Sequence, residues 1–290
     1  MNHYERCDRD MCEKTKCVIV GGAPIDHYEY VRSFLREGDF VVCCDAGLRH
    51  EEPLGVQASL IVGDFDSHER PVTDREVIVL PHEKDDTDTF YAVKECLKRG
   101  FTDFLLLGMT GGRLDHTLGN LQALVMLDEA GVRACMVDDY SEISVVSGSS
   151  EKTHKEHEKS TSRKMHEASK TVVSDGEYGT ERTTVTGKPS EQRRAILNKA
   201  IVPDSYKYFS LLAIGGDAHG VSVTGAKYPL TDATLTGDFP LGVSNEVLPG
   251  EEAHITVERG RVLLMKVVRD VNDNYMPLYP AVYDDALVGS

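Results

Sequence analysis

The chain lacks the features that mark several broad classes of protein. Among its 290 residues there is no tryptophan, and acidic side chains exceed basic ones to give a formal net charge of −16. A nucleic-acid-binding protein needs a basic face to neutralise phosphates, so this balance argues against that class. No stretch approaches the ~18 apolar residues of a membrane span, and the charged N-terminus has no apolar signal region. We therefore expect neither nucleic acid nor membrane as a partner.

The cysteines show no disulfide framework. There are seven of them, an odd number, and the first three are spaced by five residues, unlike the Cys-x-x-Cys spacing of zinc sites. Cys43 and Cys44 lie within the apolar run 40–44, which is typical of a buried strand. We expect structural thiols in a reducing compartment and hence a cytoplasmic protein.

Common catalytic and nucleotide-binding motifs are also missing. The sequence contains neither a GxxxxGK[ST] phosphate loop nor a GxGxxG dinucleotide fingerprint. No Ser-His-Asp or Cys-His arrangement is evident. Any chemistry must therefore come from other polar residues.

The first half of the chain alternates between strand and helix patterns. Helical faces are predicted around residues 30–35, 90–97 and 118–127, and glycine follows the last two, at Gly100 and Gly131. Between them lie short apolar runs of strand length, at 17–20, 40–44, 59–62, 76–80, 104–108, 133–137 and 142–146. This alternation predicts an α/β fold with a mostly parallel sheet.

The rest of the chain changes character twice. After a polar, Ser-, Lys-, Glu- and His-rich stretch come short strand patterns punctuated by glycine and proline, which indicate a small all-β sandwich or barrel. His154, His157 and His166 in the polar stretch suit a solvated linker better than a metal site. The predicted organisation is a mobile tail at 1–16, an α/β catalytic domain at 17–147, a charged insertion or linker at 148–205, a β-sandwich at 206–270 and a tail at 271–290.

Acidic residues follow two of the predicted strands. Asp45 comes directly after the run 40–44, either as a helix cap or as a ligand of the crevice where parallel strands end. Asp64 and Asp66 follow the run 59–62 and repel each other unless a cation lies between them. Hard cations such as Mg²⁺ prefer such oxygen ligands, so the pattern favours a metal site over a polar turn.

Two further strand-to-helix junctions carry polar clusters. The segment 84–89, KDDTDT, exceeds what helix capping requires and suits Mg²⁺ with a polyphosphate. The segment 108–116 combines a glycine pair with Arg113, a planar donor for phosphate. Carboxylates at four strand ends thus predict one crevice and a Mg²⁺-dependent nucleotide phosphotransferase or hydrolase; they are Asp45, Asp64, Asp66, Asp85, Asp88 and Asp115.

These motifs, taken in order, resemble the thiamine pyrophosphokinase family. The resemblance rests on GGAP, CDAG, GDFDS, KDDTDT and GGRLDH in the first half, and on SVTGAKYPL and GVSNE in the β-rich part. It implies an α/β nucleotide domain, a β-sandwich and a homodimer with sites between subunits. The implied reaction transfers the diphosphoryl group of ATP to the hydroxyl of thiamine and releases AMP. Two departures are Ala46, where the family has glycine, and the charged insertion.

The resemblance also implies roles for individual residues. The expected catalytic set is Asp45, Asp64, Asp66, Asp88 and Asp115, with Asp64, Asp66 and Asp88 as Mg²⁺ ligands. The expected ATP-binding residues are Asp85, Thr87, Arg113, His116 and Asn120, and the expected thiamine-binding residues are Tyr228, Ser244 and Asn245. Two alternatives stay open: a pyrophosphokinase acting on another heterocyclic alcohol such as a hydroxymethylpterin, and a non-catalytic Mg²⁺-nucleotide sensor.

Overall fold

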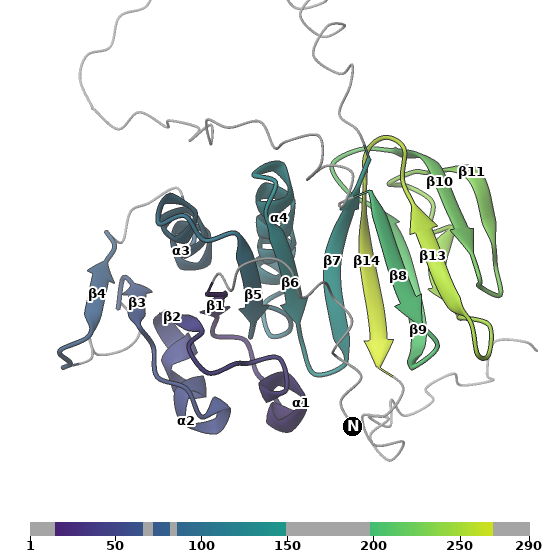
Figure 1. Ribbon diagram of the computed structural model, residues 1–290. Helices are drawn as coiled ribbons and strands as arrows, with labels where there is room; N and C mark the ends of the chain where they lie inside the picture. Colours follow the sequence, from purple (N-terminus) through teal and green to yellow (C-terminus); the bar gives the residue numbers. More distant parts are fainter. Residues whose placement is uncertain (1–14, 66–71, 82–85, 149–197, 269–290) are drawn as a thin grey trace, which may run out of the picture.

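The computed structural model describes residues 15–65, 72–81, 86–148 and 198–268 (Figure 1). These residues form a 10-stranded sheet in the order β12-β9-β14-β7-β6-β5-β1-β2-β3-β4 and a 4-stranded sheet in the order β11-β10-β13-β8. The predicted tails at 1–16 and 271–290 lie wholly or almost wholly outside the described residues, as does most of the predicted insertion. No helix in the described part of the chain is long and apolar enough to cross a membrane.

One half of the large sheet is parallel, as the alternating pattern predicted. Its strands pair in parallel from β4 across to β6. They are β1 (Cys17–Val20), β2 (Phe40–Cys44), β3 (Leu60–Gly63), β4 (Glu76–Val79), β5 (Asp103–Leu107) and β6 (Arg133–Val137). The central strands are buried on both faces, which explains their continuous apolar sequences.

Helices cover both faces of this parallel half (Figure 1). α3 (Asp88–Lys98) and α4 (Leu114–Glu129) pack on one face, and α1 (Tyr28–Arg32) and α2 (Glu51–Leu54) pack on the other. A 3-10 helix, η1 (Asp45–His50), follows β2 directly. The predicted stop at Gly100 is confirmed by its φ of 89°, and the stop at Gly131 by its φ of 68°.

The strand order places a topological switch point at the centre of the parallel half. From β1 the chain builds outward through β2, β3 and β4, then returns through α3 to place β5 on the other side of β1. The loops after β1 and β5 therefore leave their strands in opposite directions. In open α/β sheets this is where a crevice opens at the carboxyl ends of the strands.

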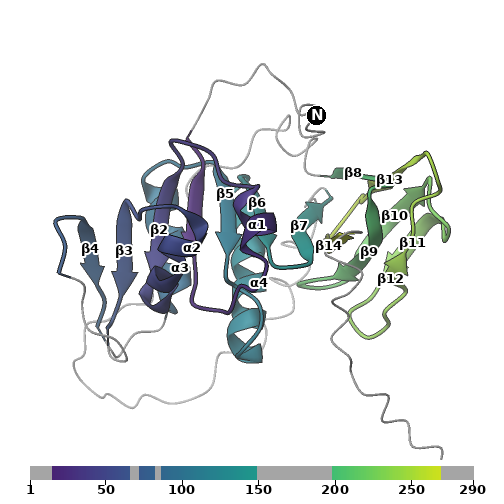
Figure 2. The same ribbon diagram turned by 90° about the horizontal axis from the view of Figure 1, so that it is seen from below.

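The other half of the large sheet is antiparallel and belongs to a sandwich (Figure 2). It contains β7 (Ser141–Ser147), β9 (Tyr206–Ala213), β12 (Gly242–Asn245) and β14 (Arg261–Val268). The second sheet contains β8 (Lys199–Pro203), β10 (Ala218–Thr224), β11 (Leu230–Leu235) and β13 (Glu252–Thr256). Alternate residues of both sheets, including Phe209, Val221 and Ile255, form one core. The expected β-sandwich is thus present.

The structure corrects the sequence-based boundaries in two places. Residues 199–203, assigned to the linker, form β8, which the sequence did not reveal because only Val202 of this edge strand is buried. β7, assigned to the catalytic domain, shares its residues between the two cores: Ile143 packs beneath the helices and Val146 packs in the sandwich. The two parts therefore share one continuous sheet.

Two buried carboxylates organise polar networks around β7, and one of these networks joins the halves of the molecule. Asp128 at the end of α4 accepts hydrogen bonds from the Ser147 hydroxyl at 2.7 Å and from Arg261 Nε at 3.0 Å. Burial raises the pKa of Asp128 above its ordinary value. Glu142 on β7 accepts from Lys266 Nζ at 2.6 Å and from the Tyr206 hydroxyl. Both carboxylates are buried and partnered: the Asp128 network fixes the sandwich against α4, and the Glu142 network joins three strands of the antiparallel half.

Candidate functional site

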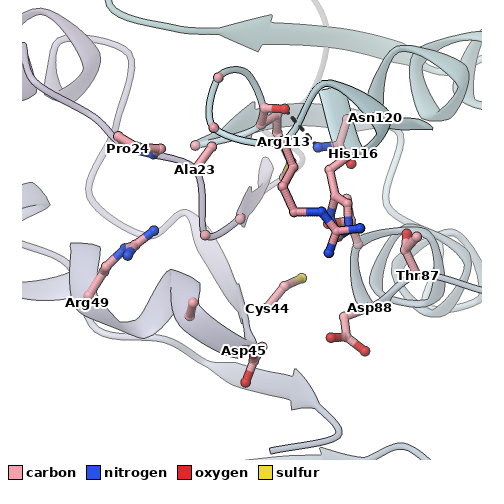
Figure 3. A pocket seen from close by; sticks show the side chains of 18 residues that line it. Ala23, Pro24, Cys44, Asp45, Arg49, Thr87, Asp88, Arg113, His116 and Asn120 are labelled. Carbon is pink, nitrogen blue, oxygen red and sulfur yellow. Dashed lines mark hydrogen bonds between the residues drawn. The ribbon is translucent and has the colours of Figure 1, made fainter. Parts of the chain in front are cut away.

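A cavity of about 370 Å³ opens at the switch point (Figure 3). Four segments line it: the loop after β1, the end of β2 with η1, the start of α3, and the loop from β5 into α4. The lining residues are 21–24, 44–46, 49, 87–89, 108–109, 111–113, 116 and 120. Six of the predicted site residues are therefore brought together here: Asp45, Thr87, Asp88, Arg113, His116 and Asn120.

Small residues let the strand ends converge beneath the cavity. A Cβ added to Gly47 would lie 2.2 Å from the Val20 carbonyl oxygen, and one added to Gly21 would lie 2.6 Å from the Gly108 carbonyl oxygen. The two loops are also hydrogen-bonded, since the Ala23 amide donates to the Gly108 carbonyl at 2.9 Å. Only glycine fits such backbone contacts, so the glycines of GGAP and CDAG form the floor of the site.

Two side-chain hydrogen bonds hold the loop between β5 and α4 in place. The buried amide of Asn120 donates through Nδ2 to the Met109 carbonyl at 2.8 Å (Figure 3). The Thr110 hydroxyl donates to Asp138, which follows β6, at 3.0 Å. Asn120, predicted to bind ATP, thus lines the cavity and also fixes the loop that carries Arg113.

The loop after β1 is held by a buried histidine. His50 Nε2 lies 3.0 Å from the Ala23 carbonyl and Nδ1 lies 2.6 Å from the Tyr28 hydroxyl. Because a carbonyl only accepts, we assign the ring proton to Nε2 and let Nδ1 accept from Tyr28. Burial first, and then the charge of Arg49, lower the pKa of His50. The fold therefore favours the neutral form of the ring.

The turn after β6 supports the same loop. Asp139 accepts hydrogen bonds from the Asp26 amide at 3.0 Å and from the His27 amide at 2.8 Å. With Asp138 it ties both glycine-containing loops to the strand β7 that leads into the sandwich. The sequence signal of these two residues was a polar turn between strands, which does not distinguish them from other turns.

Carboxylates gather at one end of the cavity. Asp45 begins η1 with a φ of 42°, a left-handed conformation that few side chains adopt. A Cβ added to Gly63 would lie 3.3 Å from the Cα and Cβ of Asp45, so the segment that carries Asp64 lies against Asp45. Asp88 lines the cavity from the first turn of α3, where the Thr87 hydroxyl accepts from the Phe90 amide at 3.2 Å.

These positions fit a hard cation. All the carboxylates named are oxygen donors, and two of them face a cavity whose other walls supply hydroxyl and amide groups. The described residues contain no ready-made group of three His, Cys, Asp or Glu side chains around one point. Asp66 and Asp85, which were predicted to belong here, lie outside the described residues. Asp64 does not line the cavity, although Gly63 before it lies against Asp45.

Basic side chains lie on two sides of the cavity. Arg113 Nη2 bonds to Asp115 Oδ2 at 2.6 Å, and both side chains are exposed. The pKa of Asp115 is lowered by this hydrogen bond. Asp115 therefore lies outside the cavity as the partner of Arg113. Arg49 lies on the opposite side from Arg113, as Figure 3 shows. Arg49 was missed by the sequence analysis, although it follows Asp45 by one turn.

The predicted thiamine residues lie in the sandwich, apart from the cavity. The buried Asn245 accepts from the Tyr228 and Glu246 amides at 3.0 and 2.9 Å, and its Nδ2 donates to the Tyr228 carbonyl at 2.8 Å. Tyr228 is 58% exposed, and Ser244 has a φ of 59°. Asn245 thus holds the backbone of Tyr228, and Lys227 Nζ lies 5.5 Å from the centroid of the Tyr228 ring.

The fold and the cavity define a class of protein. It is an α/β protein with a glycine-floored crevice at the switch point of its parallel strands, joined through a shared sheet to a β-sandwich. Two family models match this chain: thiamin pyrophosphokinase, catalytic domain, over residues 31–136, and thiamin pyrophosphokinase, vitamin B1 binding domain, over residues 198–262. Together they match more than half of the chain, which belongs to the thiamine pyrophosphokinase family.

Known proteins agree with this assignment. The chain is 23% identical over 240 residues to the thiamine pyrophosphokinase of Bacillus subtilis, covering 79% of this chain and 88% of that protein. The crystal structure of the B. subtilis enzyme matches with a TM-score of 0.61 at 20% identity, over 89% of this chain and all of that one. Thiamin pyrophosphokinase from Candida albicans matches with a TM-score of 0.58 at 11% identity, over 88% and 90% of the two chains. These structural matches confirm the predicted fold.

Proposed function

We propose that the protein transfers the diphosphoryl group of ATP to the hydroxyl of thiamine, forming thiamine diphosphate and AMP. The observation that carries the proposal is one cavity at the switch point, with carboxylates at one end and arginines at its sides, in a chain of this family. Such a cavity suits a metal-bound polyphosphate, because carboxylates attract the cation and guanidinium groups attract the phosphates.

The acidic end is the proposed metal site. Asp64 and Asp88, with Asp66 outside the described residues, would hold Mg²⁺. Bound there, the cation would neutralise charge on the ATP polyphosphate. Asp45 lies against the segment of Asp64 and adds negative charge to the same end. This charge also suits the cationic thiazolium ring of thiamine.

The remaining cavity residues bind and orient the nucleotide in this proposal. Arg113 and His116 lie at the start of α4, where backbone amides and basic side chains meet an anion. Thr87 caps α3 and thereby fixes Asp88, and Asn120 fixes the loop of Arg113. The hydroxyl of thiamine attacks the β-phosphorus, and Asp45, which lines the cavity, would receive the proton.

Thiamine binding is assigned to the sandwich, and the complete site to a homodimer. Tyr228 would stack on thiamine, with Ser244 and Asn245 supplying or positioning polar groups. None of the three lines the cavity of its own chain, so a second copy is the proposed source of this half of the site. Exposed apolar side chains in the same region, including Phe239, Leu241 and Val243, support burial against a partner.

The cysteines support a reducing, cytosolic location. Cys17, Cys43, Cys44 and Cys96 are buried free thiols, and Cys135 is a partly buried free thiol. Burial raises the pKa of Cys43 to about 12, so this thiol stays protonated.

The proposal is tested by product analysis. Purified protein is incubated with Mg²⁺, ATP and either thiamine or a hydroxymethylpterin, and the nucleotides and diphosphates are separated by chromatography. Equal amounts of AMP and thiamine diphosphate are expected with thiamine as the acceptor, and no product is expected with the hydroxymethylpterin. Formation of ADP would indicate transfer of a single phosphoryl group, and ATP binding without any product would favour a sensor. Either result would refute the proposal.

A further inference from the structure

Arg49 faces the cavity from the side away from Asp88 (Figure 3). It is the fifth of the six residues of η1, so this 3-10 helix presents an acid at its first residue and a base at its fifth. Within the part of the chain that the structure describes, Arg49 forms no ion pair, whereas Arg113 is paired with Asp115. Its charge is therefore available to a ligand in the cavity.

The neighbours of Arg49 do not use its hydrogen-bond donors. Its Nε lies 3.4 Å from His50 Nε2, but that nitrogen carries the proton donated to the Ala23 carbonyl. Two N–H groups cannot bond to each other, so this contact leaves the guanidinium free to turn into the cavity. The neutral His50 ring and the Tyr28 hydroxyl behind it form an uncharged support.

The charge of Arg49 selects among the ligands of the proposed reaction. Thiamine is a cation and is repelled by a guanidinium, whereas phosphate is attracted to it and matches its planar donors. The acidic end near Asp45 and Asp88 suits the metal-bound, transferred part of ATP. An arginine on the opposite side of the cavity suits the α-phosphate, which is not transferred and remains in AMP.

We propose that Arg49 binds the α-phosphate of ATP and stabilises AMP as the leaving group. This inference rests on the proposed function. As the thiamine oxygen bonds to the β-phosphorus, the bond from that phosphorus to the bridging oxygen breaks. Its electron pair stays on the bridging oxygen, which becomes a phosphate oxygen of AMP, while the hydroxyl proton passes to a base or water. A guanidinium beside the α-phosphate offsets the charge that develops there.

The test measures AMP binding without turnover. Arg49→Gln removes the charge, Arg49→Lys retains it without the planar fork, and Arg36→Gln is the matched control because Arg36 is exposed outside the cavity. A charge-assisted hydrogen bond of about 1.5–3 kcal/mol corresponds to roughly 10–100-fold in affinity. By calorimetry, Arg49→Gln is expected to weaken AMP binding at least about tenfold, Arg49→Lys by less, and Arg36→Gln not at all.

Kinetics and thermal melting distinguish the loss of this contact from a general loss of folding or of substrate binding. Arg49→Gln is expected to lower kcat for thiamine diphosphorylation while the KM for thiamine stays within about twofold and the melting temperature is unchanged. Unchanged AMP affinity, or equal losses for AMP and thiamine, would overturn the role of Arg49. If the wild-type protein forms no AMP and thiamine diphosphate, the proposed function itself fails, whatever the variants bind.

Discussion

At the scale of single residues, the account depends on carboxylates that bind a cation. Asp88→Asn and Asp64→Asn are each expected to reduce turnover at least about tenfold, about 1.4 kcal/mol in the barrier, because an amide neutralises the ligand charge. Asp86→Asn is the matched control, since Asp86 pairs with Lys94 at 2.7 Å and does not line the cavity. Steady-state kinetics with circular dichroism check this. Near-normal activity of Asp88→Asn would contradict the metal assignment.

His50 gives the fold a dependence on pH. Its pKa is lowered in the fold from 6.5, so below that pH the unfolded chain binds more protons than the folded one. The contribution of neutral His50 is therefore complete above about pH 6.5 and is lost as the pH falls through the lowered pKa. We expect the stability advantage of the wild type over His50→Gln, measured by urea unfolding, to shrink between pH 7.5 and 5.5.

The control for this effect is another histidine. His254 is exposed on β13, and His254→Gln is expected to keep the wild-type dependence on pH. A constant difference between wild type and His50→Gln at all pH values would show that the proton on His50 plays no part in stability.

Single residues also show what the sequence predicts and what it does not. Asp45 stood out because it follows β2 directly, and Asp88 and Arg113 stood out because they lie in polar clusters at strand-to-helix junctions. The structure places all three around one cavity. Arg49 did not stand out, because an arginine inside a short helical turn is usually a solvated side chain. Only the 3-10 winding of η1 and the crossing at the switch point bring it to the cavity wall.

At the scale of elements, the turn between β6 and β7 is expected to shape the cavity from outside it. Asp139→Ala removes acceptors for the amides of Asp26 and His27, so the loop that carries Ala23 and Pro24 loses one of its supports. We expect a loss of about 1–2 kcal/mol in stability and a higher KM for ATP, with the KM for thiamine less affected. Urea unfolding and kinetics measure these effects.

A second acidic turn serves as the comparison. Asp238 is exposed in the sandwich, and Asp238→Ala is expected to leave the stability and the KM for ATP near the wild-type values. Equal effects of the two substitutions, or a KM for ATP unchanged by Asp139→Ala, would show that the turn between β6 and β7 does not shape the cavity.

Elements with strong periodicity were predicted well, and weak ones were missed. β1, β2 and β6 have the predicted bounds because apolar residues fill all or most of each strand, although β6 begins at the exposed Arg133. β8 and β12 escaped detection because they lie at sheet edges, where most side chains face solvent and the alternation fades. The shared sheet could not be predicted, since pairing of β7 with β14 joins residues far apart in the chain.

At the scale of the whole molecule, the account requires two chains. Val243 on the edge strand β12 is 46% exposed, and Val79 on β4, the opposite edge of the same sheet, is 50% exposed. Val243→Glu is expected to convert a dimer into monomers and to lower activity, because it places a charge in an apolar contact. Val79→Glu should leave mass and activity unchanged. Light scattering after size exclusion gives the mass; a monomeric, active wild type would refute the shared site.

The central claim, transfer of both terminal phosphates of ATP as one group, is tested most directly by ³¹P nuclear magnetic resonance of a single reaction with ATP, Mg²⁺ and thiamine. We predict that the three ATP resonances are replaced by those of AMP and the two phosphates of thiamine diphosphate in equal amounts, with neither ADP nor free phosphate. Resonances of ADP with thiamine monophosphate, or of ADP with free phosphate, would contradict the account.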